Sequence, residues 1–364
     1  MPKLSWGVFV TALALAVGIL PMAASQAAPG AKAFRSCVQL RAQFPEGVAR
    51  DAAAADAGVT RWLMRPVVNA ALYARNATRL DTNKDGIACE VKGPREAGPL
   101  TSDWVETDWC ASRASLADLA ATHDPKNPRP TLLEVAKRRY PPATAVIERA
   151  SDERLQAWLR PSPGDPNDFE NLLGSFSTVV HEEGHMLDLS LGSQAEFVYR
   201  IVDDASIVRV PTVETFARAE ILRVHPDLSI DLYAQTYLKS AGSNQDVEIL
   251  VEEFVQYVHS LASDYCAFEL PRNLTVSSRD GALTFMWWME MYLAVGRQYF
   301  PGDYAEILAN KPLVSVILDT WDRSEYWLLK TRGTRYGNDL SKMSRFVYDP
   351  KNLAEIDVLR EARV

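Results

Sequence analysis

The sequence predicts an α+β protein that is mainly helical, with a small N-terminal unit followed by a larger helical domain that carries a small sheet. From residue 100 onward, apolar residues recur mostly at helical spacing. A connector at 92–99 with two prolines and two glycines separates residues 34–92 from residues 100–364. Two β-leaning runs, 196–202 and 206–210, flank an Asp-Asp-Ala turn, which indicates a hairpin beside the helices.

Apolar periodicity also places the expected helices of the large domain. The chain has 364 residues, of which 47% are hydrophobic and 24% charged, as in an ordinary globular protein. The spacing predicts helices at 131–140, 212–223, 230–239, 247–261 and 283–300.

The first residues are typical of a secretory signal, which we place at 1–27. Lys3 precedes an apolar run at 8–20 that is too short to span a bilayer, and small residues follow it up to Ala28. No later stretch is long and apolar enough for a membrane helix. We therefore expect a mature chain that is secreted, extracellular or periplasmic, without a membrane span.

The net charge limits the classes of partner that the protein can bind, and the number of cysteines bears on the presence of disulfides. The net charge of −8 argues against a nucleic-acid role, because such proteins need a positive field. In an oxidising compartment an even number of cysteines favours two disulfides, and three pairings are open by sequence. The cysteines are Cys37, Cys89, Cys110 and Cys266.

The segment His181-Glu182-Glu183-Gly184-His185 carries the clearest chemistry. Residues four apart share one helix face, so His181 and His185 can reach one metal ion. Catalytic zinc sites use three protein ligands and leave one position open for water. Zinc acidifies water, and Glu182 is placed to take its proton and pass it to the leaving amine, which is peptide hydrolysis.

A family resemblance suggests the third ligand. The motif at 181–188, followed by Glu248-x-x-x-Glu252-x-Phe254, resembles the catalytic domain of the anthrax lethal factor family of gluzincins, which includes the Pro-Pro endopeptidases. The resemblance implies a zincin-like domain over 100–364, with Glu248 as zinc ligand and Glu252 as the carboxylate behind the ligands. Glu252 is the alternative ligand; we favour Glu248 because a carboxylate supports a ligating histidine better than Gln256 would.

Two further positions follow from the same resemblance. Tyr237 corresponds to a tyrosine that stabilises the oxyanion, with Tyr233 as a rival, although the family places its tyrosine nearer the ligand. Asp188 matches the family pattern one turn beyond His185, and equally fits a carboxylate on a helix surface.

The N-terminal unit ends in a loop that suits a hard cation. Asp81, Asn83 and Asp85 alternate before Gly86, as in a calcium-binding turn, but the twelfth position is Lys92, which excludes a standard EF-hand. An Asx-rich turn without metal is the alternative.

The N-terminal unit as a whole resembles a known calcium module. Phe34-x-x-Cys37, Phe44-Pro45-x-Gly47 and the closing 85–90 segment resemble the Excalibur family of extracellular calcium-binding domains. The resemblance implies a Cys37–Cys89 disulfide, and hence a Cys110–Cys266 pair, with calcium held by Asp81, Asn83, Asp85 and Glu90.

The sequence thus predicts a secreted zinc metalloendopeptidase that also binds calcium, with a protein or peptide substrate. Two other functions use the same residues: a non-catalytic surface-binding protein stabilised by calcium and zinc, and a zinc hydrolase of cell-wall peptides. The intact Glu182 favours an enzyme. Neither the cleavage preference nor the oligomeric state is readable from the sequence.

Overall fold

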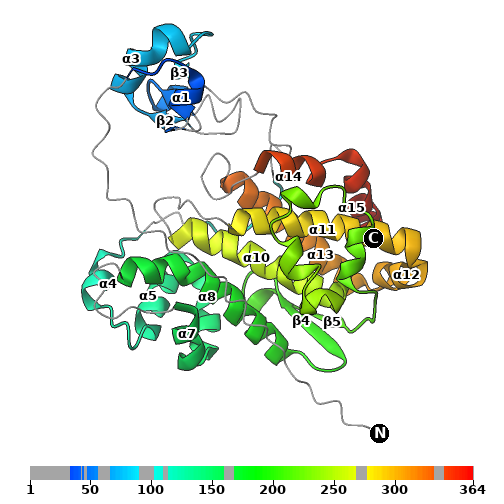
Figure 1. Cartoon of the computed structure of the whole chain (residues 1–364). Coiled ribbons are helices and arrows are strands. Elements are labelled where there is room, and N and C mark those ends of the chain that lie inside the picture. The colour runs from blue at the N-terminus through cyan, green and yellow to red at the C-terminus, as the bar shows by residue number, and fades with distance from the viewer. Residues whose placement is uncertain are drawn as a thin grey trace. The chain divides into compact units, whose positions relative to one another are not determined.

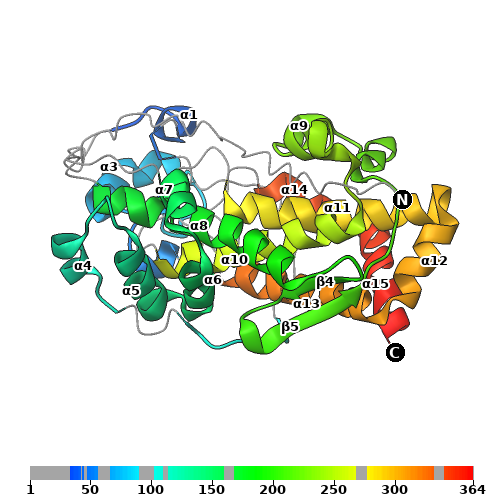
Figure 2. The same cartoon turned by 90° about the horizontal axis from the view of Figure 1, so that it is seen from below.

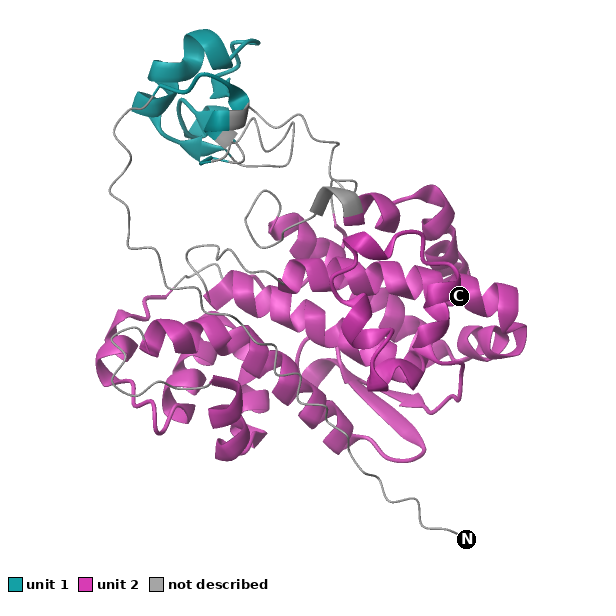
Figure 3. Cartoon of the chain, in the orientation of Figure 1, with its two compact units in different colours: residues 1–58, 66–91 teal, residues 59–65, 92–364 magenta. Residues whose placement is uncertain are grey.

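A computed structural model describes residues 33–41, 43–44, 47–55, 66–89, 102–109, 114–159, 168–267, 277–331 and 340–363. The chain divides into two compact units (Figures 1 and 3). Unit 1 comprises residues 1–58 and 66–91, and unit 2 comprises residues 59–65 and 92–364. The division falls beside the connector recognised in the sequence, while the expected signal at 1–27 and the connector itself lie outside the described residues.

The described residues of unit 1 form a small sheet with two helices. Helix α1 (Cys37–Arg41) and helix α3 (Ala70–Leu80) accompany strands β1 (Val48–Ala49), β2 (Val67–Val68) and β3 (Ile87–Ala88). The strand order is β2-β1-β3, with β1 parallel to β2 and antiparallel to β3. As the resemblance implied, a disulfide joins Cys37 to Cys89, which links α1 to the end of β3. A bond between distant chain segments helps so small a core to stay folded.

Unit 2 is mainly helical. Its shorter helices are α4 (Ala117–Thr122), α5 (Arg129–Arg139), α6 (Thr144–Arg149), α7 (Asp152–Leu159), α9 (Ala234–Tyr237), α12 (Pro301–Ala309), α14 (Leu340–Val347) and α15 (Pro350–Arg363). Its long helices are α8 (Asp168–Leu191), α10 (Val247–Ala267), α11 (Ser278–Tyr299) and α13 (Lys311–Lys330).

The long helices form the centre of unit 2. Helix α10 packs against α8, α11 and α13, and Figure 2 shows α8, α10 and α11 side by side. Helix α10 is buried almost all round, and Leu250, Phe254 and Val258 are fully inaccessible to solvent. A helix enclosed in this way has its rotation set by packing on every side, which makes it a rigid support for a site.

The expected hairpin is confirmed and forms the small sheet of unit 2. Strands β4 (Glu196–Arg200) and β5 (Ile207–Pro211) pair antiparallel, with Glu196 opposite Pro211 and Arg200 opposite Ile207. Asp203 caps the turn by accepting a hydrogen bond from the backbone N–H of Ala205 at 2.9 Å. Strand β4 contacts α8 and α10, and β5 contacts α13, so the hairpin packs against the long helices.

Two expected helices are largely wrong. In place of a helix over 212–223, only residues 218–223 form a 3₁₀ helix, and 230–239 holds only the short α9. In the first segment a distant group takes a backbone N–H that the helix needs, because Arg218 donates to the carbonyl of Gln245. In the second, the Asp231 carboxylate accepts from the backbone N–H groups of Tyr233 and Ala234, and the helix begins only at Ala234. Periodicity cannot anticipate such tertiary competition for the backbone.

Among the residues that the structure describes, none of the helices is both long and apolar enough to cross a membrane.

Candidate metal centre

The two motif histidines lie one turn apart on α8, and the Nε2 atom of each ring faces the Nε2 atom of the other. Their Nε2 atoms are 3.1 Å apart and their ring centroids 4.7 Å apart. Around the motif, Val180, Gly184 and Leu187 of α8 are buried. The helix therefore presents both imidazoles from a fixed backbone.

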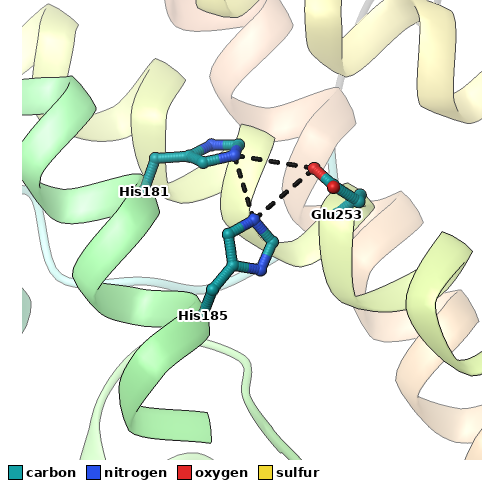
Figure 4. Close-up of side chains that lie close together, drawn as sticks. All are labelled: His181, His185 and Glu253. Atoms are coloured by element: carbon teal, nitrogen blue, oxygen red, sulfur yellow. Dashed lines mark hydrogen bonds and ion pairs between the residues drawn. The ribbon is translucent and has the colours of Figure 1, made fainter. Parts of the chain in front are cut away.

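Glu253 of α10 completes a three-residue cluster with these histidines (Figure 4). Its Oε2 lies 3.6 Å from His181 Nε2 and 3.5 Å from His185 Nε2. Ligands of a tetrahedral zinc ion at 2.0–2.1 Å are about 3.3–3.4 Å apart, so a triangle of this size matches one face of such a site. Glu253 Oε2 is buried and makes no hydrogen bond to any described residue, which leaves it available to a cation.

Glu248, the third ligand expected from the sequence, does not reach the histidines. Its Oε1 accepts a hydrogen bond from the backbone N–H of Val213 at 2.8 Å, and burial raises the pKa of Glu248 to about 7. Within the described ranges, His181, His185 and Glu253 form the only group of three whose possible ligand atoms all lie within 4.8 Å. Glu253 therefore replaces Glu248 in the cluster.

The second nitrogen of each imidazole has a partner that orients the ring. Nδ1 of His185 lies 3.0 Å from Glu252 Oε1, and Nδ1 of His181 lies 3.0 Å from the hydroxyl of Ser260. If both Nδ1 atoms carry the proton and donate it to these oxygens, both Nε2 lone pairs point at Glu253. Glu252 thus lies behind a histidine, in the place where the resemblance put it, while Ser260 was not foreseen.

A buried polar layer lies beneath Glu252 and joins α8 to α10. The side-chain amide of Gln256 donates to Asp188 Oδ2 at 3.1 Å and to Glu252 Oε1 at 3.3 Å. Asp188 also accepts a hydrogen bond from the backbone N–H of Arg200, so it connects the layer to β4. Gln256 fits there because Gly184 has no side chain: a Cβ on Gly184 would lie 2.0 Å from Gln256 Oε1.

Burial and neighbouring charges act in opposite directions on the pKa values of His185 and Glu253. Burial alone would lower the pKa of His185, but Glu252 and Glu253 outweigh it and hold the pKa well above its usual value. Burial likewise opposes the ionised form of Glu253, yet the two histidines bring its pKa well below the ordinary range. For Asp188, burial and the neighbouring Glu252 both raise the pKa.

Tyr237 lies within electrostatic range of Glu182 and Glu253. Glu182 follows His181 on α8 and is half-buried. Burial raises the pKa of Tyr237, and the negative charges of Glu253 and Glu182 raise it further. The Tyr237 hydroxyl lies 3.1 Å from the hydroxyl of Tyr257, whereas the rival Tyr233 donates its hydroxyl to the carbonyl of Ser277. Tyr237 therefore shares the environment of the cluster, and the Tyr233 hydroxyl is engaged elsewhere.

Arg218 is a buried cation next to this tyrosine. It is 2% exposed, and its Nη1 makes no hydrogen bond to the part of the chain described. Burial lowers the pKa of Arg218, while the nearby Glu253 opposes that change. The sequence offered no signal for Arg218, because it lies in the segment wrongly expected to be a helix.

The loop of unit 1 has the oxygen-rich geometry expected for calcium. Asp81 is 6% exposed, and its Oδ2 accepts hydrogen bonds from the Tyr73 hydroxyl and the Gly86 N–H. Its other oxygen, Oδ1, is buried without a hydrogen-bond partner among the described residues. Asp85 Oδ1 accepts from the N–H of Ile87, and Gly86 has a φ of +93°, which glycine adopts most easily.

Comparison with known families gives one match. The family model of the Excalibur calcium-binding domain matches residues 34–90. Residues 34–90 form an Excalibur calcium-binding domain. No curated protein and no solved structure matches the chain. The likeness of the second unit to lethal factor-type gluzincins rests on its motifs alone.

The remaining predicted residues are only partly visible. Cys266 is disulfide-bonded, while its expected partner Cys110 lies outside the described residues. Glu90, the fourth expected calcium ligand, also lies outside them.

Asp81 provides a test of the calcium loop. In the Excalibur domain, Asp81→Asn keeps an acceptor for Tyr73 and Gly86 but removes the charge that a hard cation prefers. We expect calcium at 100 times its dissociation constant to stabilise the wild-type domain by about 2.7 kcal/mol and Asp81→Asn far less. Titration calorimetry of the full chain with calcium, and with magnesium as control, gives the dissociation constants, and thermal unfolding with and without calcium measures the stabilisation. Equal calcium binding by both proteins would contradict the assignment.

Proposed function

We propose that unit 2 is a zinc-dependent peptidase in which His181, His185 and Glu253 hold the metal. The observation that carries the proposal is the triangle of ligand atoms with sides of 3.1, 3.5 and 3.6 Å, with Glu182 next to it in the motif. Two imidazole nitrogens and one carboxylate oxygen are the donor set of hydrolytic zinc sites, and they leave a fourth position for water or substrate.

The roles of the side chains follow from their chemistry. Bound zinc would supply a Lewis acid that polarises the peptide carbonyl and acidifies water. Glu182 takes a proton from the attacking water and delivers it to the leaving nitrogen, as a carboxylate beside the site can do in both directions. Tyr237 donates its hydroxyl to the developing oxyanion, which its raised pKa permits because the phenol stays protonated. Glu252 and Ser260 keep the imidazoles oriented.

The location we propose is extracellular or periplasmic. An Excalibur domain and a disulfide both suit an oxidising compartment with millimolar calcium. The substrate is then a protein or peptide met outside the cytoplasm, and peptides of the cell wall belong to the same chemical class.

Exchange of Glu253 and of Glu248 for glutamine tests the centre. Glu253→Gln should lose most bound zinc and peptide hydrolysis, because it removes the anionic ligand from a site of three. Glu248→Gln is the matched control on the same helix; its Oε1 bonds Val213, and glutamine retains an acceptor there. We expect the control to keep zinc and activity, as measured by metal analysis of the purified protein and by cleavage of a peptide library with and without chelator.

Each result has a definite meaning. Loss of zinc in Glu248→Gln with retention in Glu253→Gln would restore the assignment made from the sequence. Zinc binding without chelator-sensitive cleavage of any peptide would instead support a non-catalytic binding protein.

A further inference from the structure

Arg218 contacts both the main chain and the ring of Tyr237. Its Nε donates a hydrogen bond to the backbone carbonyl of Tyr237 at 3.1 Å, and its guanidinium carbon lies 5.0 Å from the centre of the tyrosine ring. The backbone N–H of Arg218 donates in turn to the carbonyl of Gln245 at 2.7 Å. One side chain therefore contacts both the main chain and the ring face of Tyr237, and it is itself anchored.

Tyr257 holds the other end of Tyr237. The two hydroxyl oxygens are 3.1 Å apart. The ring of Tyr257 meets the ring of His181 edge to face, with centroids 4.7 Å apart. On its far side it packs on Gly281 of α11, where a Cβ would lie 2.1 Å from Tyr257 Cδ1, so that only glycine leaves room for the ring. Tyr257 is thus fixed between a histidine of the centre and the next helix.

We propose that Arg218 and Tyr257 are positioning residues that hold the Tyr237 hydroxyl for the reaction at the metal centre. The inference rests on the proposed peptidase function. In a pair of hydroxyls only one O–H can donate to the other, so a Tyr257 that donates leaves the O–H of Tyr237 free for the substrate oxygen. A donor already held in place needs no reorganisation when the oxyanion forms.

A double-mutant cycle tests whether Tyr257 affects the reaction by positioning the Tyr237 hydroxyl. Tyr257→Phe keeps the ring against His181 and Gly281 but removes the hydroxyl, and Tyr237→Phe removes the proposed donor. We expect Tyr257→Phe to lower kcat roughly tenfold with KM changed less than about twofold, since misplacement of a donor weakens only transition-state contacts. In the Tyr237→Phe background the same change should alter kcat less than about twofold, because the group that it positions is gone.

Arg218 enters the cycle in the same way. Arg218→Lys keeps the charge but not the planar fork, and Arg218→Met keeps only the aliphatic stem. Both should lower kcat in the wild-type background and have little effect with Tyr237→Phe. Tyr292→Phe is the control: it removes a fully buried hydroxyl that donates to the carbonyl of Phe216 outside the centre, and kcat should stay within about twofold.

The outcomes separate the inference from the function on which it rests. If Tyr257→Phe and Arg218→Met lower kcat equally with and without the Tyr237 hydroxyl, they act independently of it and the inference is overturned. A loss of zinc in these variants has the same consequence, because the effect then lies in the metal site. A wild-type protein that cleaves no peptide in a chelator-sensitive manner overturns the proposed function and the inference together.

Discussion

Glu182→Gln is expected to lower kcat/KM for peptide hydrolysis by about 10²–10⁴-fold, the usual range for loss of a general acid or base. The variant has nearly the same volume and shape, so α8 should fold as before. Glutamine cannot take a proton from water at neutral pH, whereas the proposed zinc ligands His181, His185 and Glu253 are unchanged. The effect should therefore fall on kcat while bound zinc stays near the wild-type amount.

The comparison needs wild type and variant on one peptide library, with and without chelator, alongside metal analysis. Glu183→Gln is a matched control in the same motif, because Glu183 is 1% exposed and pairs with Arg154 and Trp158 outside the cluster. The Glu183→Gln exchange should chiefly lower the free energy of unfolding. Cleavage that is the same for Glu182→Gln and wild type would contradict the peptidase mechanism.

Gly184→Ala should destabilise unit 2 and disrupt the metal centre. The added Cβ would lie 2.0 Å from Oε1 and 2.7 Å from Cδ of Gln256, which is only 2% exposed and bonded to Asp188 and Glu252. Either α8 and α10 separate, or Gln256 leaves two buried carboxyls without their donor. Overpacking of this kind typically costs about 1–3 kcal/mol of the free energy of unfolding. When Gln256 moves, Glu252 loses its hydrogen-bond donor and no longer orients His185. Denaturant unfolding and metal analysis measure the two effects.

Gly302→Ala is the control for this change, because a Cβ at Gly302 of α12 meets nothing within 4 Å. There the free energy of unfolding should stay unchanged or rise by up to about 1 kcal/mol, as alanine restricts the unfolded chain more than glycine does. Gln256→Ala should make Gly184→Ala less costly, since it removes the atoms that clash. If Gly184→Ala is as harmless as Gly302→Ala, close contact between the helices does not determine the centre.

Sequence patterns predicted those parts of the protein that depend on neighbours along the chain. The hairpin at 196–211 and the long helices α10 and α11 follow from local periodicity, and both were expected. The segment 212–223 was expected to be a helix but is not one over most of its length, because its conformation depends on hydrogen bonds to residues far along the sequence. The backbone N–H of Arg218, for example, donates to the carbonyl of Gln245 and not to a carbonyl within its own segment.

By itself, the sequence determined that His181 and His185 share a helix face and that Glu182 lies between them, because a spacing of four residues is a property of one helix. The packing of α10 against α8 decides which carboxylate of α10 completes the cluster. Glu252 and Glu253 are neighbours in the chain but point about 100° apart around a helix of 3.6 residues per turn, so the rotation of α10 about its axis decides which of them faces the Nε2 atoms of both histidines. That rotation is set where Gln256 packs on Gly184 and where Ser260 meets His181, and only the tertiary structure brings these residues together.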